Sequence, residues 1–343
     1  MASMSHVIIL TRFEPSPVGH GGNHRSYQVQ WDCIQAFGSS NITTVSVPLW
    51  RSNTISSMAR YVAAKWNWLR RLRKWCRNPR RVLFREGLFA GQFALPGLLE
   101  YYEQLVRVVR QPAVCIGDEG VRQAFSPVNT RYGIPTVACP QNIESFDAVP
   151  LRRNRRLYNW VRLMDLSDEL AVLGECAERF FISKVEVGVI GGLGLTARYY
   201  PYRPVGEIER GLQIIRERRK RSCIAPGLFL LIGTAVHKST RTAFRWFINN
   251  AIRYGLPEGV KVIVAGKQTN ELCVTNAHSR ANALEFRGWI EQKELDDLLS
   301  RVCAVLIPQT HGFGALTRLP ELAYAGVPVI VSQHATMAMD PLP

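Results

Sequence analysis

The stretch AVLIPQTHGFGALTRLPELAYAGVPVIVS, residues 304–332, decides the fold. Its order predicts a buried strand at 304–307, a glycine-rich loop at 308–315, a helix at 317–324 and a second buried strand at 327–331. Glycines in such a loop let the backbone approach a ligand, and the N–H groups that open the following helix favour a phosphate. Glu321 lies early in that helix, and a carboxylate can accept hydrogen bonds from the hydroxyls of a ribose. The pattern indicates a nucleotide site, although most such units in α/β proteins bind no ligand.

Strands and helices alternate along the rest of the chain. Apolar runs of a few residues with helices between them are typical of a parallel sheet covered on both faces. In the first half we expect strands at 7–11, 43–47, 82–84, 113–116, 136–138 and 170–173, and helices at 23–37, 98–109 and 151–163. In the second half we expect strands at 228–232, 261–265 and 284–286, and helices at 240–254 and 291–300.

A glycine- and tyrosine-rich stretch from Gly191 to Pro204 interrupts this alternation. We interpret it as the link between an N-terminal domain, residues 1–195, and a C-terminal domain, residues 206–343. A surface loop within one domain is the alternative. The length of 343 residues is ample for two domains with separate cores.

The composition excludes several classes of protein. A hydrophobic share of 47% indicates a globular chain, and no apolar run is long enough to span a bilayer. The N-terminus lacks a signal peptide, so we expect a cytoplasmic protein. The eight cysteines are scattered without CxxC spacing, which favours reduced thiols over disulfides or a zinc site. No Asp-x-Asp pair is present, and we expect no metal and no other cofactor.

The net charge of +16 is unevenly distributed. No acidic residue lies between Asp32 and Glu86, whereas the segment from Lys65 to Arg81 is rich in arginine, lysine and tryptophan. On a helix these residues give an apolar face with tryptophans at its margins and basic groups around it, which is typical of a helix lying on an anionic membrane. An ordinary helix with solvated charges is the alternative. We expect a peripheral position at the inner face of the plasma membrane, and no nucleic-acid partner because no nucleic-acid-binding motif accompanies the charge.

The segment 312–330 resembles the donor-sugar-nucleotide site of retaining GT-B glycosyltransferases, particularly glycosyltransferase family 4. The family pattern of Gly-Phe-Gly, a Glu, and Ala-x-Ala-Gly-x-Pro-Val-Ile is present as residues 312–314, Glu321 and residues 323–330. The resemblance implies two Rossmann-like domains whose parallel sheets face a cleft. It also implies that Glu321 binds the nucleotide ribose.

The loop before Glu321 follows the family only in part. The resemblance implies that Gly312, Phe313, Gly314 and Ala315 approach the sugar and the phosphates. His311 stands where the family usually has a second Glu, and its spacing to Glu321 is two residues longer than in the family.

Two further loops resemble the family's diphosphate-binding loops. Gly21 and Gly22 match the N-terminal glycine loop, although paired glycines are also common in plain turns. In the second loop Gly233 matches the family, Thr234 replaces the family's Arg, and Lys238 matches its Lys. Cations at this place stabilise the departing nucleoside diphosphate. Arg318, one turn before Glu321, is a candidate for the missing cation, and a solvated helix residue is its alternative.

The acceptor side has weaker candidates. Gln141 and Asn142 lie in a run that looks like the family's His-Asn-x-Glu-Ser, with Gln141 in place of the His. A glutamine can hydrogen-bond a sugar hydroxyl but cannot transfer a proton. Asp118 and Glu119 are the best carboxylate candidates at a strand end, although residues of this kind often only cap a helix.

The sequence thus predicts a retaining hexosyltransferase that moves a sugar from a UDP- or GDP-linked donor to a hydroxyl of a glycan or lipid-linked acceptor, in cell-envelope or exopolysaccharide synthesis. A GT-B scaffold that binds without catalysis and a sugar-nucleotide epimerase are the alternatives. Family members continue beyond the strand at 327–331 by another βα unit or two. Because this chain stops at Pro343, we expect an incomplete C-terminal domain.

Overall fold

The computed structural model of the protein describes residues 6–46, 98–109, 114–117, 119–147, 166–167, 169–273, 283–310 and 314–336. The predicted basic helix within 65–81, the strand at 82–84 and the helix at 151–163 lie outside these residues. Two compact units make up the chain. The first contains Met1–Ile182 and Glu186–Pro201, and the second contains Ser183–Val185 and Tyr202–Pro343.

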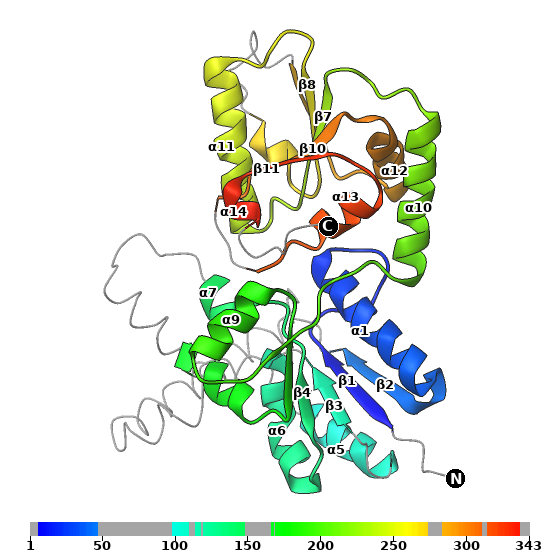
Figure 1. Ribbon diagram of the computed structural model, residues 1–343, viewed down its shortest axis with the longest axis vertical. Helices are drawn as coiled ribbons and strands as arrows, with labels where there is room; N and C mark the ends of the chain where they lie inside the picture. Colours follow the sequence, from blue (N-terminus) through cyan, green and yellow to red (C-terminus); the bar gives the residue numbers. More distant parts are fainter. Residues whose placement is uncertain are drawn as a thin grey trace, which may run out of the picture. The chain divides into compact units, whose positions relative to one another are not determined.

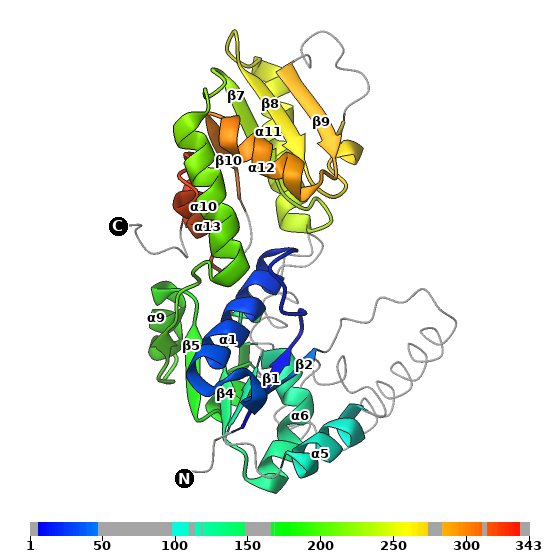
Figure 2. The same cartoon turned by 90° about the vertical axis from the view of Figure 1, so that its right-hand side faces the viewer.

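The first unit contains a parallel sheet in the order β2-β1-β3-β4-β5-β6. Its strands are β1 (Val7–Thr11), β2 (Ile42–Ser46), β3 (Val114–Gly117), β4 (Thr136–Ala138), β5 (Glu178–Phe181) and β6 (Arg198–Tyr199). Its helices are α1 (Gly21–Phe37), α5 (Leu98–Val108), α6 (Glu119–Tyr132), α7 (Glu144–Asp147) and α9 (Lys184–Gly192), and η1 (Ser39–Asn41) is a single 3-10 turn. Figure 2 shows α5 and α6 side by side beneath this sheet.

The second unit contains a parallel sheet in the order β11-β10-β7-β8-β9. Its strands are β7 (Leu228–Ile232), β8 (Lys261–Ala265), β9 (Leu284–Gly288), β10 (Ala304–Ile307) and β11 (Val329–Val331). Its helices are α10 (Gly206–Arg221), α11 (Lys238–Tyr254), α12 (Gln292–Arg301), α13 (Arg318–Tyr324) and α14 (Gln333–Thr336), and η2 (Asn270–Leu272) is a 3-10 turn. The predicted α/β fold with two parallel sheets is confirmed.

Helices cover both faces of each sheet, as the apolar strands predict. In the second unit, Phe244 and Ile248 of α11 pack on one face, whereas α10, α12 and α13 contribute to the core on the other (Figure 1). In the first unit, alternate residues of β1 point to opposite faces. Ile8 and Leu10 pack with α5 and α6, and Val7 and Ile9 pack with α1.

Two sequence predictions in the first unit are wrong. Residues 170–173, predicted as a strand, belong to a helix that covers 169–174, and the neighbouring strand is β5. A run of four apolar residues does not distinguish a buried helix from a strand. Gly191 and Gly192, predicted to begin the interdomain link, are the last residues of α9.

The stretch that joins the two units is held against α1 of the first unit. Arg25 donates to the carbonyl oxygens of Tyr200, at 2.8 Å, and Pro201, at 3.4 Å. Its guanidinium lies 4.3 Å from the centre of the Tyr200 ring, and Gln28 donates to Pro201 O at 3.0 Å. The Tyr200 hydroxyl donates to Asp32. These contacts fix the chain up to the residue that precedes Tyr202.

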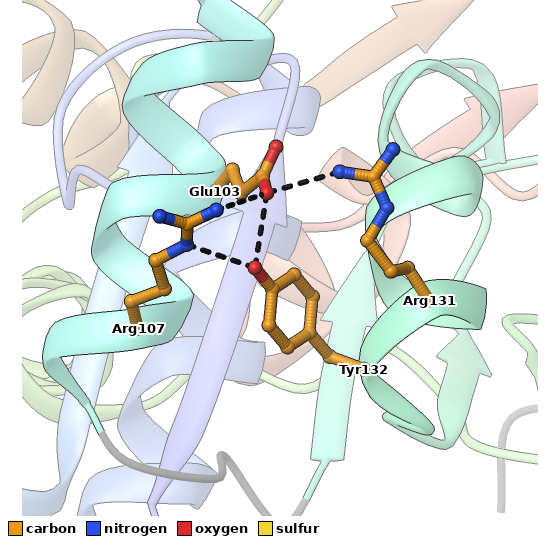
Figure 3. A network of polar contacts seen from close by, with 4 residues as sticks. All are labelled: Glu103, Arg107, Arg131 and Tyr132. Atoms are coloured by element: carbon orange, nitrogen blue, oxygen red, sulfur yellow. Dashed lines mark hydrogen bonds and ion pairs between the residues drawn. The ribbon is translucent and has the colours of Figure 1, made fainter.

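A polar network links α5 to α6 at the surface (Figure 3). Tyr132 donates to Glu103 Oε1 at 2.9 Å, and Arg107 and Arg131 donate to the same oxygen at 2.9 and 3.0 Å. Arg107 Nε also donates to the Tyr132 hydroxyl at 2.9 Å. These hydrogen bonds lower the pKa of Glu103, first through Tyr132 and then through Arg107. The network links the exposed faces of the two helices.

No helix in the described part of the chain combines the length and the apolar character needed to cross a membrane.

Candidate active site

The carboxyl ends of β7, β8 and β9 are joined by close backbone contacts in the second unit. Gly233 N donates to Ala265 O at 3.1 Å, and Gly266 N donates to Gly288 O at 2.6 Å. Gly266 has φ +124°, and a Cβ placed on it would lie 2.0 Å from Gly233 O. A side chain at Gly266 would therefore separate the loops. This edge of a Rossmann-like sheet is where ligands bind in open α/β folds.

Arg318 lies at the end of β7 although it belongs to α13. Its Nη1 donates to Ile232 O at 2.5 Å and lies 3.0 Å from the place that a Cβ on Gly233 would occupy. The cation therefore reaches the loop in which Thr234 replaces the family's Arg. Burial lowers the pKa of Arg318 and the charge of Glu321 opposes that shift. An arginine so placed stays protonated and presents a poorly hydrated positive charge.

Glu321 accepts a hydrogen bond from a residue that the sequence analysis did not select. The Tyr202 hydroxyl donates to Glu321 Oε1 at 2.5 Å, and only 6% of Tyr202 is exposed. The two residues are 119 positions apart in the chain, and Tyr202 belongs to the stretch interpreted as a link. No local sequence signal marks Tyr202, because its role depends on a partner in a distant helix.

The predicted glycine-rich loop is described only at its end. His311, Gly312 and Phe313 lie outside the described residues. Gly314 has φ +99°, a left-handed conformation that favours glycine, and Ala315 follows it in a partly buried position. The helix that follows, α13, has only seven residues. Since so short a helix adds little dipole, the positive charge that α13 brings to the end of β7 is mainly that of the Arg318 side chain.

Only the backbone of Lys238 is described, as the first residue of α11. Thr234 is partly buried in the loop before this helix, and Ala235 N donates to Lys267 O at 2.9 Å. Arg241, in the first turn of α11, donates from Nε to Ala235 O at 2.6 Å. The loop after β7 is thus tied both to the loop after β8 and to α11.

In the first unit, the paired glycines and the predicted acceptor-side loop come together. Helix α1 begins at Gly21, and His20 caps it by accepting from Gly22 N at 3.1 Å. Gln141 Nε2 donates to Gly22 O at 3.3 Å. A Cβ on Gly22 would lie 2.6 Å from Phe13 and 2.9 Å from Gln141 Oε1. A side chain at Gly22 would therefore displace Phe13, Gln141 or His20 from this packing.

Two buried carboxylates hold the loop that carries Gln141 and Asn142. Ile143 N donates to Glu186 Oε1 and Ser145 N donates to Glu169 Oε2, each at 3.0 Å. Glu186 is fully buried and Glu169 is 6% exposed. Burying a carboxylate is unfavourable unless hydrogen bonds satisfy it, so these two define the loop's conformation closely. Within the described part of the structure, the buried Asn142 Oδ1 has no hydrogen-bond partner.

The remaining acceptor-side candidates are described incompletely. Asp118 lies outside the described residues, and only the backbone of Glu119 is described, as the first residue of α6. Among the described side chains, no group of three or more His, Cys, Asp or Glu residues is arranged to hold a metal ion.

Comparison with protein-family models finds no match. Comparison with curated proteins finds no significant match either. The chain is similar to solved structures over nearly its whole length. Sucrose-phosphate synthase from Thermosynechococcus elongatus matches with a TM-score of 0.58 and 13% identity, covering 97% of this chain and 82% of that one.

Two trehalose-6-phosphate synthases give similar values. The enzyme from Burkholderia multivorans has a TM-score of 0.55 and 10% identity, covering 97% of this chain and 84% of that one. The UDP-forming enzyme from Burkholderia vietnamiensis has a TM-score of 0.56 and 11% identity, covering 97% and 83%. Identities this low establish the fold alone. With its two parallel sheets and these neighbours, the chain has the GT-B fold of glycosyltransferases, built from two Rossmann-like domains.

Proposed function

We propose that the protein is a glycosyltransferase that moves a sugar from a nucleoside-diphosphate sugar to an acceptor hydroxyl. The observation that carries the proposal is the pair on α13. Arg318 presents a partly buried cation at the end of β7, and Glu321 presents a carboxylate one turn later. The cation can bind a diphosphate, and the carboxylate can accept hydrogen bonds from the hydroxyls of a ribose. The fold neighbours named above use this architecture for sugar transfer.

Arg318 supports the chemical step by its charge. Negative charge grows on the diphosphate as the sugar–phosphate bond breaks, and a fixed cation with little hydration stabilises it strongly. Lys238 is proposed to contribute a second charge, and the transfer uses no metal or other cofactor. The backbone of Gly312–Ala315 is proposed to approach the sugar.

We further propose transfer with retention, as in glycosyltransferase family 4. Gln141 cannot accept a proton, and its amide already donates to Gly22 O. In the proposed reaction the departing phosphate oxygen therefore takes the proton of the acceptor hydroxyl. Gln141 and Asn142 bind the acceptor or the transferred sugar, and Asp118 and Glu119 lie on the acceptor side.

The proposed acceptor is a glycan or a lipid-linked precursor of the cell envelope, used at the cytoplasmic face of the membrane. The basic, tryptophan-rich segment from Lys65 to Arg81 supports this part of the proposal by its composition. If it binds anionic lipid, replacing Arg70, Arg71, Arg73 and Lys74 with Gln will reduce sedimentation with phosphatidylserine liposomes. Unchanged sedimentation contradicts this part.

The donor site is tested by titrating UDP and GDP calorimetrically against the wild-type protein, Glu321→Ala and the exposed control Glu258→Ala. A carboxylate bonded to ribose hydroxyls contributes roughly 1.5–3 kcal/mol, so Glu321→Ala should weaken one nucleotide by about 10- to 100-fold. Glu258→Ala should bind as the wild type does. Equal binding by all three proteins contradicts the assignment of Glu321.

A binding scaffold without catalysis is the second candidate, favoured by Thr234, by His311 and by the fixed Gln141 amide. Nucleotide binding without hydrolysis or transfer from UDP- and GDP-sugars, across a panel of acceptors, would identify it.

A further inference from the structure

We infer that Tyr202 is a positioning residue for Glu321 and makes the donor site selective for a nucleotide with ribose hydroxyls. This inference rests on the proposed function. Its starting point is the hydrogen bond of 2.5 Å from the Tyr202 hydroxyl to Glu321 Oε1. A phenol donates and a carboxylate accepts, so the bond restrains the carboxylate of Glu321, the group that would accept hydrogen bonds from the ribose hydroxyls.

Tyr202 is well suited to fix another side chain because it is itself fixed. Only 6% of it is exposed, and a buried tyrosine hydroxyl needs a hydrogen-bond partner. Tyr202 directly follows Pro201, whose carbonyl oxygen accepts a hydrogen bond from Gln28 of α1. Glu321, by contrast, is partly exposed on a helix of seven residues. The buried tyrosine therefore restrains the more exposed glutamate.

The benefit for binding is a smaller loss of conformational freedom. An unrestrained glutamate loses rotamer entropy worth up to about 1.5–2 kcal/mol when it is ordered. With one oxygen already held by Tyr202, most of that loss occurs on folding and not on ligand binding. A carboxylate offers about four lone-pair sites, so accepting from Tyr202 is compatible with accepting from a ribose.

The bond also gives Glu321 a partner other than Arg318. The two charges lie one helical turn apart, and they influence each other electrostatically. Opposite charges so placed attract, and a direct pair would neutralise the cation needed at the diphosphate. Because Tyr202 holds the Glu321 carboxylate, Arg318 can donate to Ile232 O at the end of β7.

The test compares ribose dependence in four variants. UDP and 2′,3′-dideoxy-UDP are titrated calorimetrically against the wild type, Tyr202→Phe, Glu321→Ala and the double variant. GDP and 2′,3′-dideoxy-GDP are titrated in the same way. In the wild type the dideoxy nucleotide should bind about 100-fold more weakly. Compared with the wild type, Tyr202→Phe should bind UDP about tenfold more weakly and dideoxy-UDP equally well. The preference for UDP over dideoxy-UDP therefore falls to about tenfold. In the Glu321→Ala background, Tyr202→Phe should have no further effect.

The chain offers a matched control on the same helix. The Tyr324 hydroxyl donates to Glu209 Oε1 at 2.6 Å, so Tyr324→Phe removes a phenol–carboxylate bond without removing a partner of Glu321. This variant should keep the wild-type ratio, which separates positioning from a general loss of stability.

Three results overturn the inference. An unchanged ratio in Tyr202→Phe would show that the tyrosine only supports the fold. Tighter UDP binding by Tyr202→Phe would show that the phenol competes with the ribose. A wild-type protein that binds neither nucleotide pair would overturn the donor site and the inference together, whereas the first two results leave the donor site intact.

Discussion

Replacing Gly266 with alanine tests whether the backbone contact between the loops after β7 and β8 holds the candidate site together. The alanine Cβ would lie 2.0 Å from Gly233 O and 2.8 Å from Gly233 C. Contacts of that kind are not tolerated below about 3 Å, so one backbone segment must move by about 1 Å or more. The movement strains two hydrogen bonds, Gly233 N to Ala265 O and Gly266 N to Gly288 O.

The expected cost is large for a single methyl group. Each buried backbone bond left unsatisfied costs about 1–3 kcal/mol, and an alanine at φ +124° adds about 1–2 kcal/mol of strain. The sum is about 3–8 kcal/mol, and values in the upper part of this range are exceptional for a point substitution. Gly255→Ala is the matched control. It has φ +80° but no atom within 4 Å of its Cβ, so it should cost only about 1 kcal/mol.

Urea unfolding monitored by hydrogen exchange and mass spectrometry measures the stability of the second unit separately from that of the first in both variants. Peptides that cover β7 and β8 report on the second sheet, and peptides that cover β1 serve as the internal reference. Gly266→Ala should lose protection in β7 and β8 at a markedly lower urea concentration than Gly255→Ala, with β1 unchanged. It should also lose nucleotide binding, because Arg318 contacts the end of β7. Equal unfolding profiles for the two variants would refute the close-contact reasoning.

Three further predictions follow from single contacts. Hydrogen bonds from Tyr132 and Arg107 lower the pKa of Glu103 from its ordinary 4.5. The ionised Glu103 therefore contributes its full stabilisation above pH 4.5, and this contribution is lost as the pH falls through the lowered pKa of the folded state. Carboxyl NMR titration should show the lowered pKa in the wild type and a higher pKa in Tyr132→Phe. Glu186→Gln should weaken the bond from Ile143 N and expose the Gln141 loop to faster hydrogen exchange, whereas the exposed-site variant Glu178→Gln should not. Burial, and then the nearby Asp32, raise the pKa of Cys33 to about 11, so iodoacetamide at pH 8 should label the exposed Cys223 and Cys273 long before Cys33; equal labelling rates would contradict the buried assignment.

Apolar strands were the most predictable part of the fold. Val7–Thr11, Leu228–Ile232, Lys261–Ala265 and Ala304–Ile307 are found as predicted, because each is a short run rich in branched apolar residues that both faces of a sheet can bury. Strand β5 was missed because it contains Arg179. That buried cation is satisfied by the carbonyl oxygens of Leu173 and Cys176, at 2.6 and 2.7 Å, which lie beyond the strand. Backbone groups outside a strand that satisfy a buried charge within it leave no signal in the alternation of apolar and polar residues.

Residues 206–221 were not predicted as a helix from the sequence. Helix α10 has acidic residues in its first turn and a run of Arg and Lys in its last, an arrangement that matches the helix dipole. Its few buried positions are Gly206, Ile208 and Ile215. Such a sparse apolar stripe gives a weak periodic signal, although the charge gradient at the two ends could have identified the helix.

The candidate site was predictable where one segment contains the chemistry and unpredictable where two segments meet. Glu321 and Arg318 could be selected as candidates because the pattern around them is continuous in sequence. Tyr202 and the buried pair Glu186 and Glu169 were not, since each acts on a segment that lies far from it in the chain. Contacts of this kind are decided by tertiary packing and leave no local spacing to detect.

The replacement of an expected arginine by Thr234 has a different meaning once the side chains are placed. In the sequence alone, this replacement indicates a site that has lost a positive charge. In the structure, the Arg318 guanidinium reaches the same strand end from α13 and bonds Ile232 O beside Gly233. A departing diphosphate responds to the position of a cation and not to the residue number that supplies it. The substitution at Gln141 is not of this kind, because an amide bonded to Gly22 O supplies no proton transfer. For the proposed transfer, the first departure is therefore compatible with catalysis by charge, and the second agrees with the proposal that the departing phosphate takes the acceptor's proton.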